Sequence, residues 1–135
     1  MTPSTDTDRE KLETVKHLAE ALGFSRIVVT DCKTHDETIA FTSQLPHVLS
    51  NAYVKSPTLQ NQSGFSAGSF QDLSRVARLN EDMWTDLFLM NKEPILFELV
   101  TVIKHLQEYR EALDQTDAEK LRSLLREGRI LKENA

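Results

Sequence analysis

The stretch Arg26-Ile27-Val28-Val29-Thr30 decides how this chain of 135 residues is interpreted. It is short and rich in β-branched residues, which is typical of a strand that is buried on at least one face. No second segment has this pattern. A lone strand leaves its backbone donors and acceptors unpaired. The strand at 26–30 is therefore expected to join another chain, or to be the last piece of a sheet whose other strands are absent.

The residues before this strand predict a helix over 8–22. The spacing from Thr7 to Glu10 is that of a capping box, in which each side chain satisfies a free amide at the helix start. Apolar residues then recur at helical spacing, and Gly23 lies where a left-handed cap would end the helix. A helix followed by a strand is typical of an α/β unit, so residues 1–34 are expected to be the end of such a unit, cut from its parent.

The remaining residues, 35–135, predict a domain made of helices alone. A capping box at Thr34 predicts a helix to about Lys55, kinked at Pro46, which has no amide to donate. A long loop is expected over 56–69. Further helices are expected from Phe70, from the cap Asn80 to Met90, from about Lys92 to Leu113, and after a third capping box at Thr116. The fold class is therefore mainly α.

Composition excludes several classes of function. Sixteen Lys and Arg against 21 Asp and Glu give a net charge of −5, which argues against binding to nucleic acid or to an anionic membrane. No apolar run reaches the length of a spanning helix, and the N-terminus does not resemble a signal peptide. The single cysteine, Cys32, excludes an internal disulfide and a multi-thiolate metal site, so a cytoplasmic protein without metal is expected.

Ser43 and His47 are the strongest candidates for residues of a functional site. They lie four residues apart on one helical face, with Pro46 between them and Gln44 close by. His47 is equally well interpreted as a satisfied boundary residue. Asp72 and Arg75 are three apart, so they are expected either to pair or to present the Arg75 guanidinium to a carboxylate.

Two other candidates have plain structural alternatives. Trp84, the only tryptophan, is by default a core residue, and His35 in a first helical turn is by default a cap or a surface contact. No catalytic triad, no metal-ligand spacing and no Gly-x-Gly-x-x-Gly phosphate cradle occurs in the sequence.

Four blocks of residues resemble the helical C-terminal half of prephenate dehydrogenases, in the family's order and spacing. The blocks are His35-Asp36; Thr42-Ser43-Gln44-Leu45-Pro46-His47; Gly68-Ser69-Phe70-Gln71-Asp72-Leu73-Ser74-Arg75-Val76-Ala77; and Met83-Trp84-Thr85-Asp86-Leu87-Phe88 with Asn91. Residues 2–34 resemble the end of the same family's nucleotide-binding domain.

The resemblance implies a helical domain of the 6-phosphogluconate dehydrogenase C-terminal type, which forms a homodimer and completes the active site. The family's reaction is the oxidative decarboxylation of prephenate to 4-hydroxyphenylpyruvate with NAD or NADP, a step of tyrosine biosynthesis. The residues that bind the cofactor and the catalytic histidine belong to the N-terminal domain. The resemblance therefore implies that this chain alone binds no cofactor, has no catalytic residue and is inactive, although it is expected to bind prephenate or the product.

The resemblance also implies roles for individual residues. Arg75 would bind a substrate carboxylate and Asp72 would position it. Ser43 and His47 would contact substrate. The remaining matched positions are pocket or interface residues (Trp84 and Gly68), a residue at the domain junction (His35), and Gln44, where many members have histidine, so that its supporting role is in doubt.

Three alternatives remain open at this point. An arogenate dehydrogenase shares the fold and the motifs but accepts an amino group in place of the keto group. A histidine phosphotransfer domain would use His35 or His47. Such a domain needs a solvent-exposed histidine on a straight bundle helix, whereas His47 follows the kink at Pro46. A dimerisation module without any ligand is the third.

Overall fold

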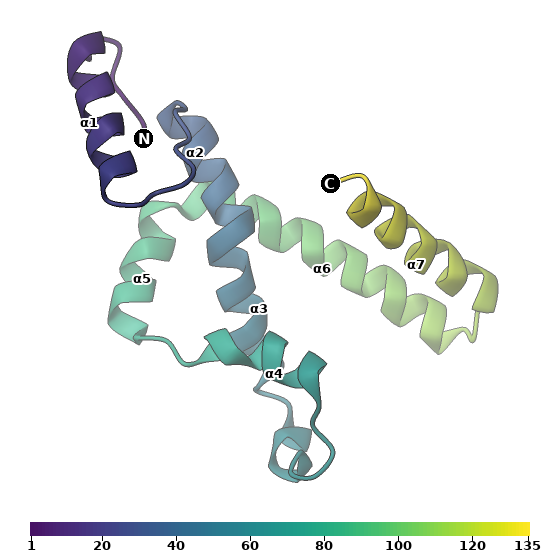
Figure 1. Cartoon of the computed structure of the whole chain (residues 1–135). Coiled ribbons are helices and arrows are strands. Elements are labelled where there is room, and N and C mark those ends of the chain that lie inside the picture. The colour runs from purple at the N-terminus through teal and green to yellow at the C-terminus, as the bar shows by residue number, and fades with distance from the viewer. The chain divides into compact units, whose positions relative to one another are not determined.

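The computed structural model describes all residues from Met1 to Ala135, and every regular element in it is a helix (Figure 1). The predicted mainly α fold class is confirmed. The elements are α1 (Arg9–Ala21), α2 (Cys32–Ile39), the π-helix η1 (Ala40–Gln44), α3 (Leu45–Tyr53), the 3-10 helix η2 (Pro57–Asn61), α4 (Gly68–Ser74), the 3-10 helix η3 (Arg75–Ala77), α5 (Glu81–Met90), α6 (Lys92–Asp114) and α7 (Ala118–Glu133).

The chain divides into two compact units, Met1–Ile95 and Leu96–Ala135. Buried apolar side chains are few in both: Ala40, Leu45 and Ile95 in the first unit, and Ala112 and Leu124 in the second. The sequence predicted a boundary between two domains at residues 34 and 35, and this domain boundary stays a prediction.

The predicted helix over 8–22 is confirmed as α1. Gly23 has a φ of 91° and donates its amide to the carbonyl of Glu20, while Phe24 donates to the carbonyl of Ala19 at 3.1 Å. These two bonds form a Schellman motif, which needs a left-handed residue after the helix. Glycine adopts that conformation without the strain that a Cβ would add.

The three predicted capping boxes are wrong in the same way, because an aspartate caps each helix in place of the threonine. The carboxylates of Asp8, Asp31 and Asp117 accept the amides of Glu10, Thr34 and Lys120, each at 2.9 Å. A carboxylate combines an acceptor with the negative charge that a helix N-terminus favours. Asp31 also accepts the Thr34 hydroxyl at 2.7 Å, so the predicted cap is a donor to the actual one.

The predicted strand at 26–30 is not formed, and the segment is extended without a sheet. Its only main-chain partner is Met1, whose amino group donates to the carbonyl of Val28 at 2.7 Å and whose carbonyl accepts the amide of Thr30 at 3.0 Å. These two bonds have the pattern of a parallel ladder around Met1 and Val29. One paired residue does not make a strand, as the shortage of partners in the sequence implied.

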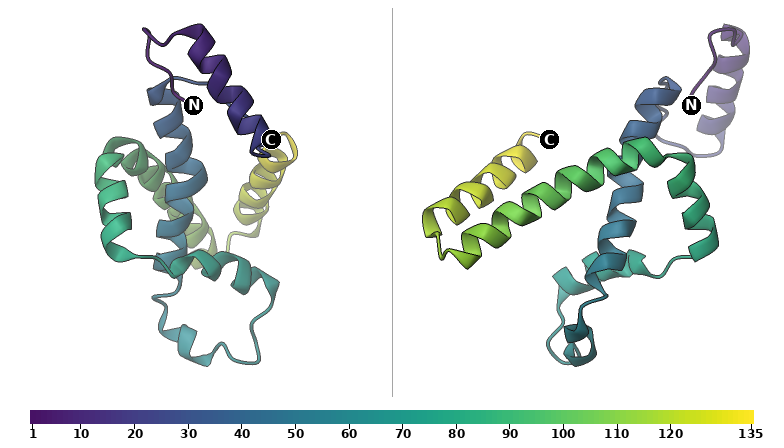
Figure 2. Two further views of the ribbon diagram at one scale, coloured as in Figure 1. Left: turned by 60° about the vertical axis from the view of Figure 1, so that its left-hand side comes forward. Right: turned by 180° about the vertical axis from the view of Figure 1, so that it is seen from behind.

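The helix predicted from Thr34 to Lys55 begins at Cys32 and consists of α2, η1 and α3 in direct succession (Figure 2). The π-helical segment η1 ends two residues before Pro46. There the amide of Leu45 bonds to the carbonyl of Ala40, five residues back. Proline disrupts the regular α-helical pattern because it has no amide, and π-helical insertions accommodate such breaks. A π-helical segment therefore lies directly before the proline at which the sequence predicted a kink.

The second unit contains most of α6 together with α7. Large apolar side chains remain exposed on it, among them Phe97 at 69%, Val100 at 66% and Leu131 at 65%. Thr116 has a φ of 54°, and Asp117 after it donates its amide to the carbonyl of Ala112 at 2.8 Å, which closes the turn between the helices. No helix of the structure combines the length and the apolar character needed to cross a membrane.

Candidate functional site

His47 lies in the first turn of α3, directly after the π-helix, and its ring orientation is fixed by one hydrogen bond. Its Nδ1 lies 2.8 Å from the carbonyl oxygen of Ser43. A carbonyl only accepts, so Nδ1 is the donor and carries the proton in the neutral ring. The Nε2 atom is consequently the one left to bind a ligand. The sequence placed Ser43 and His47 on one face, and the structure joins the His47 ring to the main chain of Ser43, while a role of the Ser43 hydroxyl stays a prediction.

The other constraint on His47 is Trp84 of α5. The two rings are stacked, with centroids 3.9 Å apart and planes inclined by 28°. Phe88, one turn further along α5, lies 5.3 Å from Trp84. Trp84 is half-buried. It therefore packs against a candidate site residue, and its role in a pocket stays a prediction.

A groove of about 280 Å³ lies between α3 and α5, which run in opposite directions (Figures 1 and 2). His47 and Asn51 line it from α3, four residues apart on one helical face, and Lys55 lines it from the turn just after the end of α3. Glu81, Trp84 and Phe88 line it from α5. An aromatic surface and groups of both charges thus share one concave site, which is typical of small-molecule binding.

Gln44 lies behind this groove and is 5% exposed. Its Nε2 donates to the carbonyl of Leu87 at 3.2 Å, and its Oε1 accepts the side-chain amide of Asn91 at 2.8 Å. Asn91 also donates to the carbonyl of Asp36 at 2.9 Å. This network connects the π-helix to the end of α5. Gln44 therefore supports the site without lining it.

The structure does not bring the remaining predicted residues into this groove. Arg75, Asp72 and Gly68 are exposed on α4 and η3, and none of them lines it. Arg75 and Asp72 do not form an ion pair within one copy of the chain, and the positioning role of Asp72 stays a prediction. His35 is exposed in the first turn of α2, where its Nδ1 lies 2.9 Å from Asp36 Oδ1.

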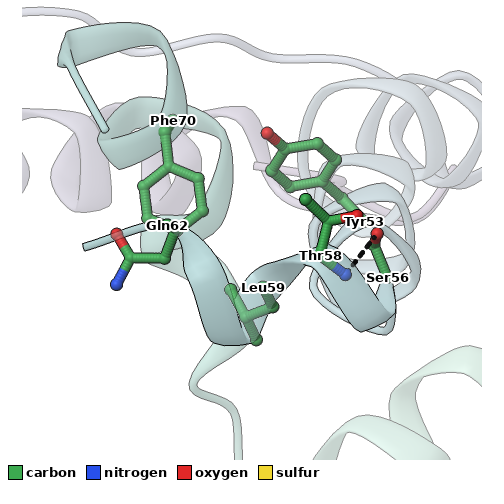
Figure 3. A pocket seen from close by; sticks show the side chains of 6 residues that line it. All are labelled: Tyr53, Ser56, Thr58, Leu59, Gln62 and Phe70. Atoms are coloured by element: carbon green, nitrogen blue, oxygen red, sulfur yellow. Dashed lines mark hydrogen bonds between the residues drawn. The ribbon is translucent and has the colours of Figure 1, made fainter. Parts of the chain in front are cut away.

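A second cavity of about 330 Å³ lies against the predicted long loop (Figure 3). Tyr53 and Phe70 face it, and the Ser56 hydroxyl accepts the amide of Thr58 at 3.2 Å beside it. It contains no charged side chain and no predicted site residue. Nor does the structure gather three or more His, Cys, Asp or Glu side chains into a group that could hold a metal ion.

Sequence reasoning missed Asn51, Lys55 and Glu81 as groove residues. The spacing of four from His47 to Asn51 and Lys55 was a usable signal for the first two. Glu81 had no such signal, because its position depends on how α5 packs against α3. Asn91 was part of the resemblance, but its bond to Gln44 joins residues that are 47 positions apart.

Comparison with known proteins identifies relatives along most of the chain. The sequence model of the family described as "Prephenate dehydrogenase, dimerization domain" matches residues 31–127. The prephenate dehydrogenase of Bacillus subtilis is 29% identical over 129 residues, which are 90% of this chain and 34% of that protein. The prephenate dehydrogenase of Lactococcus lactis is 28% identical over 131 residues, 92% of this chain and 36% of that protein.

The fold also matches a solved structure of about twice the length. The crystal structure of prephenate dehydrogenase from Aquifex aeolicus, in complex with hydroxyphenyl propionate and NAD+, superposes with a TM-score of 0.80 at 27% identity. The match covers 98% of this chain and 48% of that one. This chain spans about a third of the length of the two curated relatives and about half of this structure.

Proposed function

Because this chain belongs to the prephenate dehydrogenase family and contains its dimerization domain, we propose that it supplies the substrate-binding surface and the dimer interface of such an enzyme. The reaction would be the oxidative decarboxylation of prephenate to 4-hydroxyphenylpyruvate with NAD or NADP, in the tyrosine biosynthesis of the cytoplasm. The observation that carries the proposal is His47, fixed between the Ser43 carbonyl and Trp84 in a concave groove.

The groove residues would bind and orient the substrate. With Nδ1 donating to Ser43, the Nε2 atom of the neutral His47 ring can accept a hydrogen bond from a hydroxyl group of the ligand. Trp84 and Phe88 offer an apolar aromatic surface to a six-membered ring. Lys55 adds a positive charge for a carboxylate. These groups position a substrate but include no acceptor for hydride.

Arg75 would bind a second carboxylate, since prephenate carries two and the chain has a net charge of −5. The support for this role is chemical, because a guanidinium matches a carboxylate with two parallel hydrogen bonds, and Arg75 has no ion-pair partner. Asp72, Gly68 and His35 would line the completed site or its junctions, and Gln44 would support the helix that carries His47.

The chain's own residues do not fit a dinucleotide. None of its four glycines lies in a phosphate-binding loop between a strand and a helix. We assign no residue of this chain to NAD or NADP. The cofactor would be bound by the main part of a dinucleotide domain, which is not included in this chain. Residues 1–34 would be the end of that domain, and the parallel hydrogen bonds between Met1 and the segment 28–30 support this assignment.

The dimer interface would lie on the helical domain. Only five apolar residues of the chain are buried, whereas Phe97, Val100 and Leu131 are at least 65% exposed. Apolar surface of this kind is typical of a protein that associates with a second copy. Sedimentation at micromolar concentration is expected to give a dimer, and a monomer would contradict this part of the proposal.

The test of the proposed reaction compares the chain with a chimera. The 135-residue chain, mixed with prephenate and NAD, is expected to form no NADH. A chimera in which it replaces the helical half of the Bacillus subtilis relative is expected to form NADH. NADH formed by the chain alone would contradict the proposal that the reaction also needs a dinucleotide domain. A folded, dimeric chimera without activity would contradict the proposed function.

A further inference from the structure

The two charged residues in the groove have no partners. Lys55 and Glu81 take part in none of the ion pairs of the structure, although both line the same groove. Surface charges of opposite sign that lie close together gain little by pairing and are readily separated by a ligand. The groove therefore offers one free cation and one free anion to whatever occupies it.

The positions of these charges follow from the antiparallel course of α3 and α5. Lys55 lies two residues beyond Tyr53, the last residue of α3, and therefore past the C-terminal end of the helix that carries His47. Glu81 lies one turn before Trp84, in the first turn of α5. Because the helices run in opposite directions (Figures 1 and 2), both steps lead the same way from the His47–Trp84 stack. The aromatic stack therefore lies toward one end of the groove, and Glu81 and Lys55 both lie beyond it toward the other end.

A ligand that matches both ends has a ring at one end and a zwitterion at the other. We propose that Lys55 and Glu81 bind the α-carboxylate and the α-ammonium group of an amino acid whose ring lies against Trp84. The corresponding α-keto acid has no positive group, so Glu81 would repel it while Lys55 attracts it. The groove then prefers the amino acid over the keto acid.

This inference rests on the proposed function and specifies its substrate class. The sequence left open whether the side chain of the substrate ends in a keto group or an amino group. On the charge pattern of the groove, Glu81 selects the amino form. Glu81 is a specificity-determining residue in this account, and it takes no part in any bond that the reaction makes or breaks.

A pair of ligands isolates this one interaction. L-tyrosine and 3-(4-hydroxyphenyl)propionate share the ring and the carboxylate and differ only in the α-amino group. Trp84 is the only tryptophan, so its indole N–H gives a single cross-peak in a ¹H–¹⁵N spectrum of the full chain. Titration of that cross-peak gives the affinity for each ligand. We expect L-tyrosine to bind about fivefold to tenfold more tightly, as one charge-assisted contact at a partly exposed site provides.

Three variants assign the preference to a residue. Glu81→Gln is expected to weaken the binding of L-tyrosine to the level of the propionate, and to leave the propionate no weaker than before. Lys55→Ala is expected to weaken both ligands. Asp82→Asn removes a neighbouring charge of the same helical turn that does not line the groove, and it is expected to change neither affinity.

The outcomes separate this inference from the proposed function. Equal affinities for the two ligands, or a preference that survives Glu81→Gln, would overturn the role of Glu81 while an active chimera leaves the proposed function standing. Chemical shifts of Trp84 that respond to neither ligand, in a spectrum that remains dispersed, would overturn the groove as a ligand site. A chimera that is inactive with prephenate and with its α-amino counterpart alike would count against the proposed function itself.

Discussion

The imidazole of His47 is stacked on the indole of Trp84 and is fixed there by a hydrogen bond to the carbonyl of Ser43. Stacking and the hydrogen bond can be removed separately. His47→Phe keeps an aromatic ring over Trp84 but has no nitrogen, whereas His47→Ala removes both contacts. The two variants therefore distinguish the packing role of His47 from its role toward a ligand.

We predict that His47→Ala shifts the fluorescence emission of Trp84 to longer wavelength, because the indole gains contact with water. His47→Phe is expected to leave the emission maximum near that of the wild type and still to lose affinity for 4-hydroxyphenylpyruvate. Emission spectra and a ligand titration check both points. Full ligand affinity in His47→Phe would reduce His47 to a packing residue.

The hydrogen bonds of Gln44 predict a large effect on stability. Gln44→Leu removes one of the two donors to the Leu87 carbonyl, which keeps the Asn91 main-chain amide, and it leaves the Asn91 side-chain amide without one of its two acceptors. The free energy of unfolding is expected to fall by about 1–3 kcal/mol, as measured by urea denaturation. Gln60→Leu, on an exposed residue of η2, is the control and is expected to change it little.

A double-mutant cycle tests the pair directly. Gln44→Leu and Asn91→Leu are expected to be non-additive, with a coupling energy of about 0.5–3 kcal/mol, because both side chains belong to one network. Additive effects would show that the two amides stabilise the chain independently, and the proposed support of the helix that carries His47 would then be wrong.

Asp31 predicts a dependence of stability on pH. Hydrogen bonds from the amide and the hydroxyl of Thr34 lower the pKa of the Asp31 carboxyl below its ordinary value. A group whose pKa is lower in the folded state stabilises the fold above its unfolded pKa, and this contribution is lost as the pH falls through the folded pKa. The start of α2 is therefore expected to loosen in acid. Asp31→Asn, which keeps an acceptor but cannot titrate, is expected to flatten the acid limb of a thermal unfolding series.

A steep acid limb in Asp31→Asn, equal to that of the wild type, would assign the dependence to other carboxylates. Glu13 and Glu108 are the relevant comparison, since the pKa of each is also lowered, by hydrogen bonds to Lys16 and His105 respectively. Each of those partners lies three residues away on the same helix as its carboxylate, so neither contact resembles the cap of α2.

Enzyme kinetics distinguish two roles of Arg75, which either binds a carboxylate of the substrate or is an ordinary surface residue. In the active chimera, Arg75→Ala is expected to raise the KM for prephenate about tenfold or more, since one charge-assisted contact to a carboxylate is lost. Arg78→Ala, three residues further on and also exposed, is the matched control and is expected to change KM little. An unchanged KM in Arg75→Ala would leave Arg75 as an ordinary surface residue.

Much of the fold could be predicted because it depends on local patterns. The left-handed Gly23, the cap Asn80 and the irregularity before Pro46 are all determined within a few residues of sequence. The capping box at Thr34 failed because Asp31, three residues earlier, accepts the amide of Thr34 and so starts the helix before the threonine. A threonine pattern alone does not resolve such a choice.

The predicted strand and the missed groove residues failed for a different reason, which is distance along the chain. A strand at 26–30 needs partners, and only Met1 supplies any. The groove depends on how two antiparallel helices pack, so Glu81 carries no sign of its role in its own neighbourhood. Ser43 and His47 could be predicted because one helical turn brings them together.

The central claim is that the face of α3 and α5 around His47 and Trp84 binds the substrate of a prephenate dehydrogenase. The most direct measurement is a titration of the 135-residue chain with prephenate, followed by the single indole N–H cross-peak of Trp84. We expect a saturable movement of that cross-peak, which is lost in His47→Ala. A cross-peak that does not move, in a spectrum that remains dispersed at saturating prephenate, would contradict the claim.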